Sequence, residues 1–287
     1  MVKALHIRTL TALAAVASIS AEHFEGDGTA YTLSGVSSGN CNFMSAISVA
    51  PTNYAALNQV QWDELANCGR CAEVSCIDEA CVDQTATSVV QILDRCPECK
   101  YGDLDLSPTV FKTITGSDPS RLKIRWQFVD CPNPGNVEIC VKSGSGPTWI
   151  AVQPTNTLVG VETVTINGGG TTMLNGAYYF VLESSSPVDL TAARIVVTSV
   201  NGDKISGTYS LTPGQCLSTN QQFKSSPITI ETPMPTTPAP TATLPLPTEA
   251  PATTSAPTTA TPTTTTATDS TGTTKCHVRT GGQRHRN

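Results

Sequence analysis

Beyond its first twenty residues the sequence lacks a long apolar run, and its central part lacks a basic cluster and any Asn-X-Ser/Thr site. Without a second apolar run or a hydrophobic C-terminal tail, neither a membrane span nor a lipid-anchor signal is expected. A formal net charge of −6 without a basic cluster argues against nucleic acid or an anionic membrane as the partner. The missing acceptor site predicts no N-linked sugar.

The N-terminal residues 1–21 read MVKALHIRTLTALAAVASISA, with Lys3 and Arg8 ahead of an apolar stretch that ends in small residues. This is the pattern of a secretory signal peptide, with cleavage after Ser20 or Ala21. A buried helix or a membrane anchor is the alternative, but the apolar stretch is about half of the ~20 residues that a bilayer requires. We therefore predict a soluble, secreted, extracellular protein.

Eleven cysteines in a secreted chain indicate disulfides. Cys276 is left over as a candidate free or intermolecular thiol. Two CxxC pairs resemble a four-thiolate zinc ribbon, but their separation is long for that pattern and secretion favours oxidation, so no metal is predicted. The pairing itself stays open. Ten cysteines can pair internally: Cys41, Cys68, Cys71, Cys76, Cys81, Cys96, Cys99, Cys131, Cys140 and Cys216.

Residues 227–287 consist largely of Thr, Pro, Ala and Ser, which offer nothing to bury. This composition predicts a disordered, O-glycosylated spacer. The preceding residues show short strand patterns, of which Arg121 to Val129 is the clearest because apolar and polar residues alternate along it. Asn201-Gly202 is a hairpin signal. We predict two β domains, 22–131 and 132–226, joined near Pro132.

The stretch "DRCPECKYGDLDLSP" gathers acidic residues around one CxxC pair, from Asp94 to Pro108. Alternation places Asp105 on the side opposite its leucine neighbours, and Ser107-Pro108 predicts a helix start, with the helix ending at Gly116. Asp105 is then held just before a helix, where it can exchange a proton or bind a sugar hydroxyl. The alternative is that it only faces solvent or interacts with the helix dipole.

Four motifs resemble those of expansins and expansin-like proteins in order and spacing. The resemblance implies a six-stranded double-psi β-barrel followed by an immunoglobulin-like, cellulose-binding β-sandwich, and an all-β protein as a whole. It also implies a monomer that binds cellulose or another cell-wall glucan and loosens the wall without hydrolysis or a cofactor. The motifs are "GTAYT" from Gly28, "CGRCAEVSC" from Cys68, "DRCPEC" from Asp94 and "DLDLSP" from Asp103.

Carried over by motif, the resemblance implies that Asp105 and Asp94 are the groove acids and that Thr29 and Tyr31 bind polysaccharide. Asp103 and Glu98 stand at variable places and are expected to be solvated. A glycosidase needs a second carboxylate across the scissile bond. Family 45 hydrolases place theirs shortly after the first barrel tyrosine, but here no acid follows Tyr31 until Asp63.

Hydrolysis is therefore not expected, and the chain is predicted not to be an enzyme. A lytic transglycosylase remains an alternative because that mechanism needs no attacking water, and so does a family 45-like hydrolase. A wall adhesin without loosening activity is the third interpretation. An assay of sugar release beside wall extension separates the three.

The second domain of this family is expected to bind sugar rings through a row of aromatic faces. Trp149 matches one member of that row, while Thr148 replaces its aromatic neighbour. Tyr178 and Tyr179 lie close to a third position, and strand alternation predicts that only one of them faces outward. The row is thus incomplete or shifted, and an ordinary core tryptophan is the alternative for Trp149.

Overall fold

The computed structural model describes residues 22–225, which all fall within one compact unit. The predicted signal peptide (1–21), the predicted spacer (227–287) and Cys276 lie outside the described residues. Within residues 22–225, no helix has the length and apolar character needed to cross a membrane.

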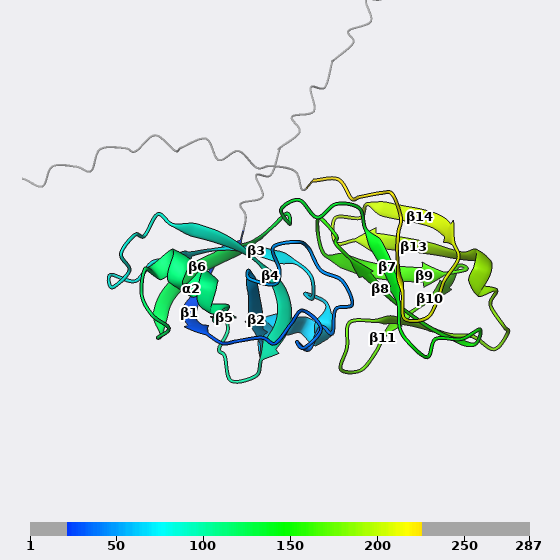
Figure 1. The fold of residues 1–287 in the computed structure, drawn as a ribbon, viewed down its shortest axis with the longest axis horizontal. Helices are drawn as coiled ribbons and strands as arrows, with labels where there is room; N and C mark the ends of the chain where they lie inside the picture. The colour runs from blue at the N-terminus through cyan, green and yellow to red at the C-terminus, as the bar shows by residue number, and fades with distance from the viewer. Residues whose placement is uncertain (1–21, 226–287) are drawn as a thin grey trace, which may run out of the picture. The chain divides into compact units, whose positions relative to one another are not determined.

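Six strands close into a barrel in the order β1-β5-β2-β4-β3-β6 (Figure 1). β1 pairs with β5, and β2 with β4, in parallel, while the other neighbours are antiparallel. The interior is filled by alternate apolar side chains, such as Leu104, Leu106 and Ile124, none of them exposed. The strands are β1 (Phe24–Ala30), β2 (Tyr54–Asn58), β3 (Cys71–Cys76), β4 (Thr87–Cys96), β5 (Leu104–Leu106) and β6 (Leu122–Val129).

Strand β6 and the helix before it form where the sequence predicts them. In β6, Ile124 and Trp126 are buried. Helix α2 (Pro108–Thr115) begins where the Ser107 hydroxyl accepts a hydrogen bond from the N–H of Val110 at 3.2 Å, with proline at its first position. It ends at Gly116, whose φ of 70° suits glycine.

Two further helical segments follow β2 directly. They are α1 (Gln59–Trp62) and the 3-10 helix η1 (Asp63–Leu65). The Asn58 side chain accepts the N–H of Gln61 at 3.0 Å and so caps α1.

The remaining strands form two sheets of a β-sandwich (Figure 1), which confirms the predicted all-β architecture. One sheet has the order β10-β9-β13-β14 and the other β11-β12-β8-β7-β15. A second 3-10 helix, η2 (Leu190–Ala192), precedes β13. The strands are β7 (Glu138–Val141), β8 (Trp149–Thr155), β9 (Val161–Ile166), β10 (Gly169–Gly170), β11 (Thr172–Met173), β12 (Phe180–Glu183), β13 (Ala193–Ser199), β14 (Lys204–Tyr209) and β15 (Cys216–Ser218).

All ten predicted cysteines pair, and the structure supplies the connectivity that the sequence left open. Cys68 and Cys71 form disulfides with other cysteines and not with each other. The two cysteines of the second CxxC motif do bond to each other, within the stretch from Asp94 to Pro108. The pairs are Cys41–Cys68, Cys71–Cys131, Cys76–Cys81, Cys96–Cys99 and Cys140–Cys216.

One fully buried amide, Gln153 on β8, joins the sandwich to the barrel segment 41–44. Its Nε2 donates to the carbonyl oxygens of Asn42 at 3.1 Å and Tyr178 at 2.9 Å, and its Oε1 accepts the N–H of Met44 at 2.8 Å. The N–H of Tyr178 also donates to the carbonyl of Cys41 at 3.1 Å. These bonds satisfy buried backbone groups from both parts.

Candidate functional site

The strand register places four side chains in one row across the barrel. Thr29 on β1 is opposite Asp105 on β5, Asp105 is opposite Ala56 on β2, and Ala56 is opposite Asp94 on β4. Paired residues of adjacent strands point to the same face of a sheet. Since the neighbours of Asp105, Leu104 and Leu106, fill the barrel interior, the row lies on the outer face.

A β-bulge brings Asp94 into this row. The register between β2 and β4 shifts by one residue, so that Ala55 pairs with Ile92 and Ala56 with Asp94. Leu93 is the extra residue, and both Ile92 and Leu93 are fully buried. Bulges re-aim side chains in this way near functional sites. Without the bulge, Leu93 would be opposite Ala56 and Asp94 would leave the row.

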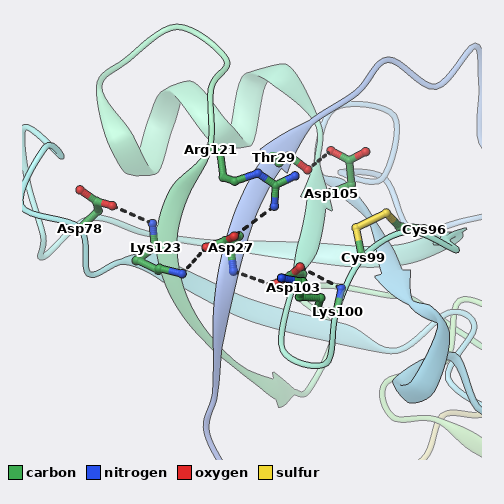
Figure 2. Close-up of polar contacts among 10 residues, drawn as sticks. All are labelled: Asp27, Thr29, Asp78, Cys96, Cys99, Lys100, Asp103, Asp105, Arg121 and Lys123. Carbon is green, nitrogen blue, oxygen red and sulfur yellow. Dashed lines mark hydrogen bonds and ion pairs between the residues drawn. A yellow bond between two sulfur atoms is a disulfide. The ribbon is translucent and has the colours of Figure 1, made fainter.

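Asp105 is partly buried, as is Asp94, the other acid of the row. The Thr29 hydroxyl donates a hydrogen bond to Oδ1 of Asp105 at 2.7 Å (Figure 2). Burial raises the pKa of Asp105, and the bond from Thr29 opposes that rise; Glu98 and Asp94 raise the pKa further, while Arg121 lowers it. Asp105 therefore keeps its proton to a higher pH than an ordinary carboxyl group, which suits a proton or hydrogen-bond donor.

The second acid of the row, Asp94, accepts hydrogen bonds from the backbone. Its Oδ1 accepts the backbone N–H groups of Asn40 and Arg95, each at 2.8 Å. One carboxylate oxygen is thus committed to holding the segment around Asn40 against β4. Asp94 supports the groove and contributes negative charge beside Asp105.

Tyr31 packs edge-on against Tyr54, with ring centroids 5.5 Å apart. Its hydroxyl is buried and has no hydrogen-bond partner among the described residues. Burial first, and then Asp94, Tyr54 and Asp105, raise the pKa of Tyr31, so the phenol stays neutral. The phenol is thus a neutral donor close to both acids, and the surrounding side chains cover its hydroxyl.

A separate ion-pair network lies on β1 and β6 (Figure 2). Asp27 contacts Arg121 at 3.1 Å and also pairs with Lys123. The Lys123 hydrogen bond lowers the pKa of Asp27; burial partly opposes this, and Arg121 adds to the lowering. Asp27 is thus a neutralised anion with little tendency to accept a proton.

Asp103 corrects one expectation from the sequence. It is not solvated but only 5 % exposed, and its carboxylate accepts the N–H groups of Asp27 at 2.7 Å and Lys100 at 2.9 Å (Figure 2). These bonds hold the turn before β5 against β1, so Asp103 is a structural residue. Glu98 is exposed, as predicted.

Tyr178 and Tyr179 correct another expectation, because both are buried, at 1 % and 2 % exposure. They precede β12 and do not alternate along a strand. Tyr178 packs on Phe43 of the barrel, with centroids 5.5 Å apart. Tyr179 packs in a small apolar cluster with Ala151 and Val181. Neither offers a ring face to a ligand.

Trp149 is the only one of the three predicted sandwich aromatics that is partly exposed in the described region. It packs on the cluster around Tyr179. Two residues of the site had no signal in the sequence. Ala56 lies in the uniformly buried strand YAALN, where no alternation marks its outer face. Arg121 acts on Asp105 only through the folding of β6 beside β1.

Comparisons with known proteins agree with this geometry. No described family profile matches the chain. Expansin-like protein 5 of Dictyostelium discoideum is 28% identical over 208 residues, which cover 67% of this chain and 83% of that protein. The crystal structure of an expansin from Clavibacter michiganensis superposes with a TM-score of 0.60 at 24% identity, covering 71% of this chain and 100% of that one.

A mutant of the same bacterial expansin in complex with cellohexaose also superposes with a TM-score of 0.60, at 23% identity over the same shares of the two chains. The closed six-stranded barrel, its row of acids and the following sandwich define a two-part double-psi β-barrel protein. Within that class, the chain is similar in sequence to an expansin-like protein and in fold to a bacterial expansin.

Proposed function

We propose that the chain is secreted and binds cellulose or a related cell-wall glucan. The glucan lies along the row of Thr29, Asp105, Ala56 and Asp94, and Trp149 contributes a ring face on the sandwich. Bound in this way, the protein loosens the wall without cleaving bonds. Five disulfides within residues 22–225 support an oxidising, extracellular setting.

The main support for this proposal is that the three acids of the site have different surroundings. Asp105 has a raised pKa, Asp94 is engaged by two backbone N–H groups, and Asp27 is paired with two cations. Hydrolysis needs one carboxyl group to protonate the leaving oxygen and a second to activate water or attack the sugar. The raised pKa of Asp105 suits the first of these roles, whereas Asp94 and Asp27 are already engaged by other groups.

Asp105 then acts on the glucan through hydrogen bonds. Its raised pKa favours the protonated carboxyl, which donates to a sugar oxygen that would otherwise bond a neighbouring chain. Trp149 offers apolar area for the face of a sugar ring. The complex of a bacterial expansin with cellohexaose supports a glucan as the ligand.

The first prediction concerns Asp105→Asn, which keeps a hydrogen-bond acceptor for Thr29 but removes the exchangeable proton. We expect the purified protein to extend clamped plant-wall or paper strips without releasing reducing sugar, and Asp105→Asn to lose this extension while it still binds cellulose. Extension and sugar release are measured on the same sample. Asp118→Asn is the matched control because the Asp118 side chain is 95% exposed, and it should behave as wild type.

Soluble oligosaccharides released at enzyme-like rates would contradict the proposal and favour a glycanase or lytic transglycosylase. Unchanged strip mechanics in Asp105→Asn, with binding intact, would instead favour a wall adhesin.

A further inference from the structure

A pocket of about 160 Å³ lies beside the groove, at its Asp94 end. Its wall combines the turn after β2, the end of β4 and the loop between β11 and β12. This volume is roughly five times the ~30 Å³ share of one water molecule, so it suits one small cyclic unit and not a polymer. The lining residues are Asn40, Trp62, Glu64, Leu65, Arg95, Asn175 and Gly176.

The pocket is tied to the groove through Asp94. The Oδ1 atom of Asp94 accepts the backbone N–H groups of both Asn40 and Arg95. Two lining residues are thus fixed by a residue of the row. A ligand lying along the row would have the pocket at its side.

Arg95 carries an unused donor. Its Nη1 donates to the side chain of Gln59 at 3.2 Å, but its buried Nε has no partner among residues 22–225. A buried guanidinium N–H without an acceptor is unfavourable, and an oxygen atom of a ligand would satisfy it.

Another part of the pocket wall is a strained turn. Asp63, Glu64 and Leu65 have φ values of 47°, 48° and 79°, three consecutive left-handed residues without a glycine. Such a run is unfavourable for L-residues and is found mostly where a site requires it. The turn buries Leu65 and leaves Glu64 exposed at the pocket.

The lining chemistry selects the ligand. A simple anion would meet Glu64, and a simple cation would meet Arg95. Hydroxyl groups both donate and accept, so they can use the carboxylate, the guanidinium and the amides of Asn40 and Asn175 together. Trp62 adds an aromatic surface. This combination fits a neutral sugar unit.

We propose that this pocket holds a single neutral sugar that branches from the glucan bound along the row. The proposal rests on the proposed function, because the branch needs a main chain beside it. It makes a branched β-1,4-glucan the preferred ligand over an unbranched one.

Calorimetric titration with two matched probes tests this: cellohexaose, and cellohexaose carrying single xylose branches. We expect wild type to bind the branched probe about three- to tenfold more tightly, the increment of one or two hydrogen bonds. Arg95→Gln and Asn175→Ala should remove this preference and leave the affinity for cellohexaose unchanged. Asn175 is exposed, so its variant should fold even if Arg95→Gln does not.

Arg194→Gln is the matched control because Arg194 is an exposed arginine on β13, outside the pocket lining, and it should keep the preference. If wild type binds the two probes with equal affinity, or if Asn175→Ala keeps the preference, the proposal that the pocket holds a branch is wrong. Binding of cellohexaose in the same experiment would still support glucan binding along the row. Failure of wild type to bind either probe overturns the groove and the pocket together.

Discussion

Two aspartates on adjacent parts of the barrel have opposite electrostatic surroundings. Asp105 is desolvated and lies near two other acids, whereas Asp27 is paired with two cations. The folded state therefore disfavours the charged form of Asp105 and favours the charged form of Asp27. The same substitution at the two positions should have opposite effects on stability.

The second prediction is that Asp105→Asn raises the free energy of unfolding at pH 7 and Asp27→Asn lowers it. The raised pKa of Asp105 destabilises the ionised folded protein above the unfolded pKa of ~3.9, and this cost disappears below it. The lowered pKa of Asp27 stabilises the fold above ~3.9, and that contribution is lost as pH falls through the folded pKa.

Urea unfolding of both variants at pH 7 and pH 3 measures these differences, and each should shrink at pH 3. Effects of the same sign, or differences independent of pH, would contradict the two assigned environments. A gain in stability with a loss of wall extension in Asp105→Asn would show that this acid is kept at a cost to folding.

At this scale the sequence identified Asp105, Asp94, Thr29 and Tyr31 because their motifs are local; their roles are still predictions. The sequence-based prediction for Asp103 was wrong, because the two backbone N–H groups that donate to this carboxylate belong to a turn and to a distant strand.

Among the elements, helix α2 is the one that the sequence defined best. Ser107 is buried, and its hydroxyl both accepts the Val110 N–H at 3.2 Å and donates to the Thr52 carbonyl at 2.5 Å. The cap thus also attaches the helix start, next to Asp105, to the segment before β2.

The third prediction is that Ser107→Ala lowers the free energy of unfolding by about 1–2 kcal/mol, because an N-cap and a buried acceptor both lose their partner. Urea unfolding measures it. Ser120→Ala is the control, since Ser120 is exposed, and its change should stay within about 0.5 kcal/mol. Equal effects in the two variants would show that the Ser107 bonds contribute nothing.

The bulge in β4 marks the limit of sequence reasoning at this scale. Val90 to Leu93 are all buried, so the run shows no alternation that would reveal which residue is extra. The bulge is visible only when β2 is paired beside it. The sequence alone thus does not predict the register that aligns Asp94 with Asp105.

In the whole molecule, the link between barrel and sandwich depends strongly on Gln153. This fully buried amide serves backbone groups of Met44, Asn42 and Tyr178. Nothing in the sequence indicates these contacts, because all three partners come from distant segments. The burial of Tyr178 against Phe43 was missed for the same reason.

The fourth prediction is that Gln153→Leu lowers the free energy of unfolding by about 2–4 kcal/mol, because buried N–H and C=O groups of both parts lose their partners. Barrel and sandwich should then melt in two calorimetric steps. Gln215→Leu is the control because Gln215 is exposed, and it should change stability by no more than about 0.5 kcal/mol. A single transition of wild-type cooperativity would rule out this coupling role.

The row across β1, β5, β2 and β4 is positioned by ladder hydrogen bonds and a bulge, and not by the identity of its own side chains. Substitutions on the outer face can therefore change what the row recognises without moving its backbone. A combinatorial library at Thr29 and Asp105, whose side chains bond each other, would search new sugar specificities on an unchanged frame. The feature that sets the spacing of the acids is thus also what makes the barrel evolvable.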